Sequence, residues 1–538
     1  MLLESLRKKD IYWWVLLIII IVTFFKGLTW IAVVPLWHTP DEAAHFSTIQ
    51  HYAEQIDLTK VRSGFGASRE LQITEQFLET ERGDDGTTAF TFKPNYKIQY
   101  SQSQAGIYEK EISSLPIEYR KQLVHHEQAY YPPLYYWIGQ IIYQSVYKSD
   151  IILRAFTIRL FSILTIIGVV IVSYFLAKEI FPQKKYLHLT LPIIVSFQPM
   201  LSFVSAGINS DNLFNFLFSL FLLLGVYLIT RGLDLKKVMF LGGIVGLGFL
   251  VKPQFIIALV IAICLIIYDF VRTKRVLFFI STSIIFLTIM IAFGGFTAIQ
   301  EAMANFRESG LLLPYIETGS FSNPQSEPSF FSHLQNSFRQ TIAQTLPWYW
   351  GVFKWLSLTL PRVINQILMR VMLVGAIGLV VKFFLDLKKR DFSRPNQAFI
   401  FLAFSAIIYF FAIIWRDWQH LRAFGFSLGI QGRYFFPVLT AHLTLLFVGL
   451  LTLTPEKFKK ITVALAVIGS ILLNFIALYT VIATSYVLNS FTVVINQMSQ
   501  YKPWYFKGEL LIVLFCSYLI ATISLLIVFG LVLLRKSQ

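Results

Sequence analysis

The chain has 538 residues, of which 56% are hydrophobic, 16% aromatic and only 14% charged. Because an ordinary soluble domain carries about 25% charged residues, this composition excludes a soluble globular enzyme and indicates a protein that crosses a membrane many times. The formal net charge of +16 would favour nucleic acid as the partner of a soluble protein. Here the positions of the charges indicate membrane topology instead, so no nucleic-acid partner is expected.

Basic residues recur in every second connection between apolar runs. By the positive-inside rule these connections face the cytoplasm, together with both chain termini. We therefore expect a multi-pass protein of the cell membrane. The basic clusters lie at residues 7–9, 178–185, 231–237, 272–275, 388–390, 457–460 and 535–536.

About twelve apolar runs predict membrane-crossing helices, since a crossing needs about 20 residues. In chain order they lie near residues 12–35, 156–177, 187–207, 211–230, 238–251, 255–271, 276–297, 366–387, 398–415, 434–453, 461–484 and 510–534.

Two stretches are too polar to cross a bilayer, and topology places both outside the cytoplasm. The first contains amphipathic segments near residues 43–56, 68–80 and 108–122, which predict helices lying against the membrane surface. The fold class expected is all-α, a polytopic membrane protein with two extracytoplasmic loop regions. The chain then divides into a first helix (1–37), the first loop region (38–150), helices two to seven (151–297), the second loop region (298–365) and helices eight to twelve (366–538).

The densest group of chemically capable residues follows the first predicted helix, in the sequence Pro40-Asp41-Glu42-Ala43-Ala44-His45-Phe46. One interpretation is structural, because Thr39, Pro40 and Glu42 have the spacing of a capping box. That box does not require Asp41. A carboxylate in the first helical turn stays ionised and can accept a proton at neutral pH, so Asp41 and Glu42 are candidate catalytic residues.

His45 follows Asp41 by four residues, so both project from one face of a helix. This spacing suits an acid–imidazole pair or a shared divalent metal ion. His45 is therefore a candidate for substrate binding, and Asp41 with His45 a candidate metal site. Whether a metal cofactor is used stays open.

The first loop region closes on Tyr130-Tyr131-Pro132-Pro133-Leu134 before the second predicted helix. The two prolines fix an extended entry into that helix and hold Tyr131 in place, where its phenol could orient a substrate hydroxyl. For the aromatic residues that follow, Tyr135, Tyr136 and Trp137, an interfacial belt is the favoured interpretation.

Polar residues also occur at the outer ends of later helices. Asn209 and Asp211 lie between two predicted spans, where Asp211 is either functional or a helix N-cap. Lys252 and Arg433 are cations on the outer side, against the topology rule. Arg433 can hold a phosphate through its guanidinium fork, or it can be an interfacial anchor.

These motifs, in this order, resemble a bacterial family of predicted membrane proteins with the signature Pro-Asp-Glu-x-x-His-Phe. That family is similar to the GT-C superfamily of glycosyltransferases that use polyprenyl-phosphate donors. The segments that carry the resemblance are Pro40-Asp41-Glu42, Tyr131-Pro132-Pro133-Leu134, Asn209-Ser210-Asp211 and Gly432-Arg433-Tyr434.

The resemblance implies that Asp41 is the general base in an inverting transfer of a sugar from a polyprenyl-phosphate donor. The acceptor would be an extracytoplasmic glycan, lipid or protein, and the site would include membrane lipid. Related lipid A aminoarabinose transferases often carry lysine where this chain has Tyr131, which leaves Lys252 or Arg433 to hold the phosphate. The alternative is a transporter or flippase for a lipid-linked or anionic solute.

Overall fold

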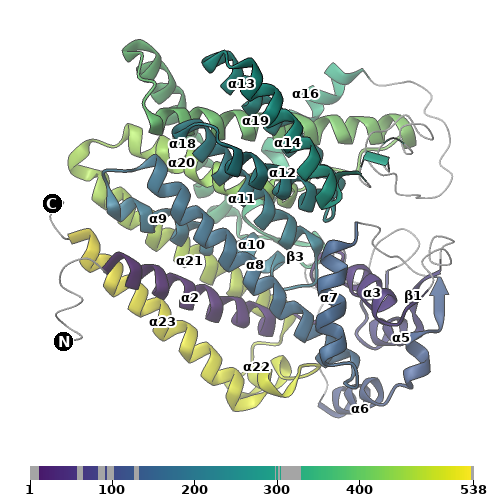
Figure 1. The fold of residues 1–538 in the computed structure, drawn as a ribbon. Helices are drawn as coiled ribbons and strands as arrows, with labels where there is room; N and C mark the ends of the chain where they lie inside the picture. Colours follow the sequence, from purple (N-terminus) through teal and green to yellow (C-terminus); the bar gives the residue numbers. More distant parts are fainter. Residues whose placement is uncertain are drawn as a thin grey trace, which may run out of the picture.

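The computed structural model describes residues 11–56, 65–82, 102–125, 132–296 and 329–534, together with residues 91, 93, 299, 300 and 303. The described chain is predominantly helical (Figure 1). Ten helical segments in it are long and apolar enough to cross a membrane. The expected all-α polytopic membrane protein is thereby confirmed. The long helices are α2 (Ile11–Val33), α8 (Ile151–Ile180), α11 (Ser210–Arg231), α13 (Ile256–Thr273), α14 (Val276–Met290), α18 (Arg362–Lys389), α19 (Arg394–Phe424), α20 (Leu439–Leu453), α21 (Lys459–Ser485) and α23 (Gly508–Leu534).

Four of these spans include a short helical turn at one end. These turns are η2 (Pro253–Phe255) before α13, η3 (Ile291–Gly295) after α14, η5 (Gly432–Val438) before α20 and η6 (Glu456–Phe458) before α21.

Two of the expected spans are shorter than a bilayer crossing. The span predicted near 187–207 is broken into α9 (Lys185–Ser196) and α10 (Pro199–Val204), and the span predicted near 238–251 is α12 (Leu235–Phe249). Proline at the first position of α10 ends the preceding helix, because it cannot donate a backbone hydrogen bond. Ten rather than twelve of the expected spans therefore have the length of a crossing in the described residues.

A buried lysine stabilises the break between α9 and α10. Lys26, on α2, donates hydrogen bonds to the backbone oxygen of Ser196 and, over 2.8 Å, to Oγ of Ser202. Asn474 on α21 donates to the same Ser202 Oγ over 3.0 Å. Because a broken helix leaves carbonyl groups without partners in the membrane, these side chains replace the missing backbone hydrogen bonds.

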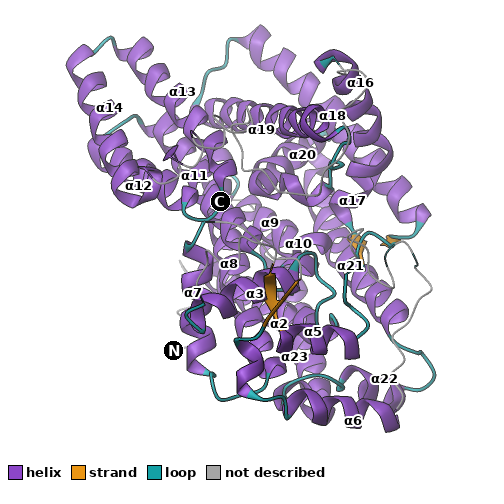
Figure 2. Ribbon diagram, turned by 90° about the vertical axis from the view of Figure 1, so that its right-hand side faces the viewer, coloured by secondary structure: helices purple, strands orange, loops and turns teal. Residues whose placement is uncertain are grey.

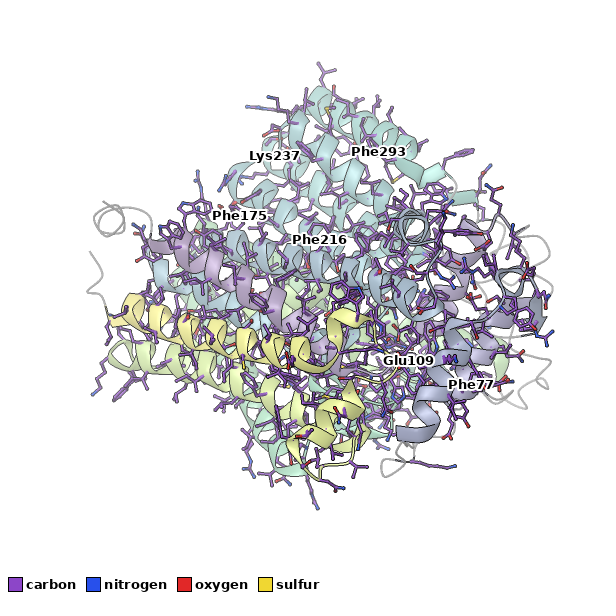
Figure 3. The ribbon with its side chains drawn as sticks, turned by 90° about the horizontal axis from the view of Figure 1, so that it is seen from below. Phe77, Glu109, Phe175, Phe216, Lys237 and Phe293 are labelled. Carbon is purple, nitrogen blue, oxygen red and sulfur yellow. The ribbon has the colours of Figure 1, made fainter. Side chains whose placement is uncertain are left out.

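The long helices pack in sequence-distant pairs. The N-terminal α2 lies beside the C-terminal α23 and against α8, and α8 also contacts α9 and α11. In Figure 1, α12, α13 and α14 stand at the opposite edge of the bundle from α2 and α23. Glycines allow some of these contacts, since a Cβ at Gly168 would lie 2.4 Å from the ring of Phe216. Figure 3 shows Phe175 and Phe216 within this packed part.

The first loop region folds against one end of the bundle. It contains α3 (Glu42–Ala53), β1 (Phe65–Ser68), α5 (Arg69–Phe77), α6 (Gln102–Ser113), η1 (Ile117–Arg120), β2 (Leu123–His125) and α7 (Leu134–Ser145). The antiparallel pair of β1 and β2 was not expected, whereas helices at 43–56 and 68–80 were. Glu109, labelled with Phe77 in Figure 3, pairs with Lys507 beside α23 and so joins this region to the C-terminal helix.

The described part of the second loop region contains α16 (Phe330–Gln340), η4 (Thr341–Thr345), α17 (Leu346–Trp350) and the short strands β3 (Val352–Phe353) and β4 (Leu358–Thr359). In this part, α17 lies against α10 and α18, whereas α16 lies against α19 (Figure 2). The turn between the strands holds three successive residues with positive φ, Lys354, Trp355 and Leu356. The C-terminal part adds α22 (Phe491–Met498) and η7 (Trp504–Phe506) between α21 and α23.

Candidate active site

Backbone contacts bring the separate motif segments together. Asn209 donates from Nδ2 to the oxygen of Pro40 over 3.0 Å, which joins the loop before α11 to the start of α3. Leu134 N, after the two prolines, donates to the oxygen of Leu250 over 2.8 Å, two residues before Lys252. Segments far apart in the sequence therefore form one site.

Asp41 is the N-cap residue of α3 but does not cap it with its side chain. Its backbone is left-handed, with φ of 59°, and the carboxylate makes no capping hydrogen bond. Instead, Asp41 Oδ2 accepts a hydrogen bond from Arg433 Nη2 over 2.9 Å, and Oδ1 lies 3.9 Å from Arg82 Nη1. The side chain keeps 35% of its surface exposed, so this carboxylate is both paired and accessible.

Glu42 has a different environment, although it adjoins Asp41. Its side chain is fully buried, and the Arg159 guanidinium of α8 binds both carboxylate oxygens, over 2.6 and 2.7 Å. The backbone N of Ile208 donates to the same carboxylate over 3.2 Å. The capping-box interpretation of Thr39 and Glu42 is therefore wrong, because Asp41 occupies the N-cap position and Glu42 faces the protein interior.

Arg159 also fixes the end of α2. Its guanidinium donates to the backbone oxygens of Val34 over 3.0 Å and Pro35 over 2.9 Å. One buried ion pair thus holds the last turn of α2, the first turn of α3 and the loop before α11 in a fixed relation. Because Asp41 lies between these points in the sequence, its position is set by this pair.

The second carboxylate of the site is that of Asp211. Asn209 is the N-cap of α11, and its Oδ1 accepts from the backbone N of Asp211 over 2.8 Å. The N-cap interpretation of Asp211 is thus wrong, and the Asp211 carboxylate instead pairs with Lys252 and lies 4.0 Å from Arg433 Nη1. Acidic and basic side chains therefore alternate in the order Asp41, Arg433, Asp211, Lys252.

His45 lies beside this alternating row. Its Nδ1 is 3.0 Å from the hydroxyl of Tyr136, and the two rings stack at 6.0 Å between centroids. Burial, followed by the charge of Lys252, lowers the pKa of His45 to about 4, although Asp41 and Asp211 act in the opposite direction. His45 is consequently neutral at neutral pH and is oriented by Tyr136.

The aromatic residues after the two prolines are mostly internal. Tyr135 and Tyr136 are buried, whereas Trp137 is 46% exposed. The interfacial-belt interpretation is therefore wrong for the two tyrosines, because Tyr136 supports His45 and Tyr135 packs near Phe161. The exposure of Trp137 suits an interface. Tyr131 lies outside the described residues.

The electrostatics of Asp41 result from opposing influences. Burial alone raises the pKa of this carboxyl, but the charges of Arg433 and then Arg82 outweigh it and bring the pKa to about 2. Asp41 is therefore ionised at any physiological pH.

The described residues near Asp41 are mostly paired with one another. No group of three or more histidine, cysteine, aspartate or glutamate side chains in the described part of the chain is arranged to hold a metal ion. Asp41 and Asp211 are each neutralised by a cation already, and His45 faces Tyr136. The metal site predicted from Asp41 and His45 therefore stays a prediction.

Sequence analysis missed several residues that shape the site. Arg159 lies inside an apolar span, and a charge in such a place is itself a signal of function or pairing. Arg82 gave no such signal, because it lies in a polar loop. Arg433 Cζ lies 5.6 Å from the ring of Tyr434, which places that predicted residue next to the guanidinium.

The sequence matches the model of one protein family, described as a predicted membrane protein family, DUF2142, over residues 24–441. This range includes every motif segment of the candidate site. No curated protein matches the sequence.

Several solved structures are similar at low identity. They include ArnT from Cupriavidus metallidurans in the apo state, with 14% identity, a TM-score of 0.42, and 94% of this chain and 74% of that chain covered. The apo oligosaccharyltransferase of Archaeoglobus fulgidus has 13% identity and a TM-score of 0.45, with 88% and 56% covered. ArnT bound to undecaprenyl phosphate has 14% identity and a TM-score of 0.38, with 86% and 75% covered. At these values the likenesses carry no function to this chain.

Proposed function

The chain belongs to the family of predicted membrane proteins DUF2142, and we propose that it is an integral membrane glycosyltransferase. In this proposal a sugar moves from a polyprenyl-phosphate donor to an acceptor glycan, lipid or protein, with inversion at the anomeric carbon. The site would face the extracytoplasmic side, and both termini the cytoplasm. The observation that carries the proposal is the hydrogen bond between the partly exposed Asp41 carboxylate and the Arg433 guanidinium.

The alternating charges suit a reaction in which a phosphate is the leaving group. A sugar joined to polyprenyl phosphate is a phosphodiester with one negative charge, and the phosphate gains a second as the bond to the anomeric carbon breaks. Arg433 and Lys252 are the cations that would stabilise this charge. Asp41 and Asp211 hold these two cations close to each other, so that a donor phosphate would meet both.

Asp41 would be the general base. Paired with Arg433 it has a pKa of about 2 and is a weak base, whereas general-base catalysis is best when the pKa lies near the working pH. A donor phosphate that draws Arg433 away removes the strongest favourable charge from Asp41 and so raises its basicity. Asp41 then takes the proton from the acceptor hydroxyl, whose oxygen attacks the anomeric carbon while polyprenyl phosphate leaves.

The other predicted site residues receive supporting roles in this scheme. Glu42 would act as a positioning residue through Arg159, and Asn209 through its hydrogen bond to Pro40. His45, neutral and held by Tyr136, would bind a sugar hydroxyl. Asp211 would hold Lys252, and Tyr434 would line the phosphate side next to Arg433. For Tyr131 the proposal keeps the substrate-orienting role predicted from its sequence position.

A direct assay tests the general base. Detergent-purified protein is mixed with polyprenyl phosphates carrying different radiolabelled hexoses or pentoses, with cell-envelope membranes as the acceptor source. Release of free polyprenyl phosphate and movement of label into the envelope fraction are expected. Asp41→Asn should lower the rate about 10²–10⁴-fold, while Asp391→Asn, an exposed carboxylate in the loop after α18, should not.

Two outcomes would contradict the proposal. Full turnover by Asp41→Asn would remove the general base. Movement of intact lipid-linked sugar across vesicles by the wild-type protein, with no release of polyprenyl phosphate from any donor, would favour the transporter instead.

A further inference from the structure

A cavity lies on the far side of α17 from Arg433. Its volume is about 630 Å³, and its wall is formed by η4, α17, β4 and the first turns of α18. Pro347 and Trp348 of α17 belong to that wall. The backbone of the same helix also touches Gly432, since a Cβ on Gly432 would lie 2.2 Å from Tyr349 N and 2.6 Å from the carbonyl carbon of Trp348. One short helix therefore separates the cavity from the segment that carries Arg433.

Among the described residues that line it, the cavity has cationic side chains and no acidic one. Two arginines of α18, Arg362 and Arg370, line it together with the neutral amides of Gln344, Asn365 and Gln366. Neither arginine has a hydrogen bond or ion pair with any residue that the structure describes. In a membrane protein such a charge is costly unless water, a ligand or an anion accompanies it.

The depth of the two arginines matches a lipid headgroup. Eight residues separate them along α18, which corresponds to about 12 Å. From Arg370 to the basic residues Lys388 and Lys389, at the other end of the helix, the distance is about 27 Å, close to the thickness of the hydrocarbon core. With α18 along the membrane normal, Arg370 would lie near the boundary between acyl chains and headgroups, and Arg362 within the headgroup region.

The surface beside the cavity suits acyl chains. Leu360, Met369 and Trp348 contribute apolar wall, and α18 continues from the cavity with exposed Ile367, Val374 and Ile377. A ligand that satisfies both parts has an anionic head and an apolar tail. Guanidinium groups bind phosphate through paired N–H donors, which favours a phosphate-bearing head.

We propose that this cavity is a binding site for one anionic membrane lipid, held by its phosphate headgroup between Arg362 and Arg370. The site is distinct from the Asp41 cluster and does not depend on the proposed transferase activity. The shared ligand chemistry is that of a phosphate group, which an anionic phospholipid or free phosphate could supply. The cavity's continuity with the apolar face of α18 assigns the lipid.

Counting retained lipids tests this site without any turnover assay. Protein in neutral detergent is incubated with phosphatidylglycerol or with phosphatidylcholine, and bound lipids are counted by native mass spectrometry. One phosphatidylglycerol is expected to persist at a concentration at least tenfold below that needed for phosphatidylcholine. Arg362→Gln with Arg370→Gln should abolish this preference.

A control variant removes two positive charges from the other end of α18. This variant, Lys388→Gln with Lys389→Gln, should keep the preference. Because Arg362 and Arg370 are exposed, the double glutamine variant should fold. If its melting temperature without lipid falls, Arg370→Lys takes its place as the test variant. Arg370→Lys should weaken lipid binding, because lysine lacks the paired N–H donors of arginine. Equal retention by all variants would overturn the site, and displacement of the lipid by millimolar inorganic phosphate would overturn its assignment to lipid.

Discussion

The Asp41 carboxylate and the Arg433 guanidinium, 392 residues apart in the sequence, are joined by a hydrogen bond of 2.9 Å. One belongs to the turn that begins α3 and the other to the turn that begins the α20 span. Neither helix contributes the site alone. The active-site proposal therefore depends on how the membrane helices pack, and substitutions at either residue should show it.

Replacing Arg433 should change both the rate and its pH dependence. Arg433→Gln should lower turnover about 10²–10³-fold, because it removes a charged donor to the leaving phosphate. Arg433 is also the strongest influence that lowers the pKa of Asp41 to about 2. Its loss raises that pKa, so the rate of the variant should begin to fall at a higher pH than the wild-type rate when the medium is acidified.

A profile of kcat/KM from pH 3 to 8 measures both effects, because kcat/KM reports the free enzyme, in which Arg433 is paired with Asp41. Arg433→Lys keeps the charge and should show the smaller pH shift. An acidic limb at the same pH in Arg433→Gln and wild type would contradict the pairing of Arg433 with Asp41.

The Glu42–Arg159 pair should contribute to stability rather than to chemistry. Both side chains are fully buried, so Glu42→Gln leaves the guanidinium charge unpaired and should lower the free energy of unfolding by about 3–5 kcal/mol. Thermal melting in detergent measures this loss. The double variant Glu42→Leu with Arg159→Met removes both charges and should recover part of it. If each single variant melts like the wild type and lacks activity, Glu42 acts in catalysis directly.

Gly432 should be intolerant of any side chain. A Cβ there would lie 2.2 Å from Tyr349 N and 2.4 Å from Tyr349 Cα, both backbone atoms that cannot rotate away. Gly432→Ala should therefore displace α17 and lower the melting temperature and the activity together. Gly469→Ala is the control, because a Cβ at Gly469 meets nothing within 4 Å. Similar melting temperatures for the two variants would show that α17 moves freely.

Stability should fall as the medium is acidified, partly through His45. Burial lowers the pKa of His45 from 6.5 to about 4, so the unfolded state binds the proton first. The contribution of His45 to the free energy of unfolding is fully present above pH 6.5. Between pH 6.5 and pH 4 that free energy falls by about 1.4 kcal/mol per pH unit. Melting temperatures measured from pH 7.5 to pH 4.5 should fall less steeply in His45→Gln. An identical slope would show that His45 is already charged in the folded protein.

Much of the topology could be predicted from the sequence, because a membrane crossing requires a long apolar helix and basic loops. The topology also placed Asp41, Asp211, Lys252 and Arg433 on the outer side of the membrane, whereas their pairing depends on how distant helices pack. The small β1–β2 sheet could not be foreseen in this way, since its strands are only four and three residues long.

The different environments of Asp41 and Glu42 could not be predicted from the sequence, in which the two residues are adjacent. Their difference depends on the left-handed backbone of Asp41, which turns one carboxylate toward Arg433 and the other toward Arg159. It also depends on Arg159, a residue of a distant helix. The capping box has the right spacing for Glu42, but a buried arginine binds that carboxylate more strongly than a backbone N–H would.

The five residues of α17 have the cavity on one side and Gly432 on the other. Because a glycine at this contact leaves no space for movement, α17 and the segment that carries Arg433 must shift together. Any change that displaces α17 should therefore also displace the Arg433 guanidinium relative to Asp41.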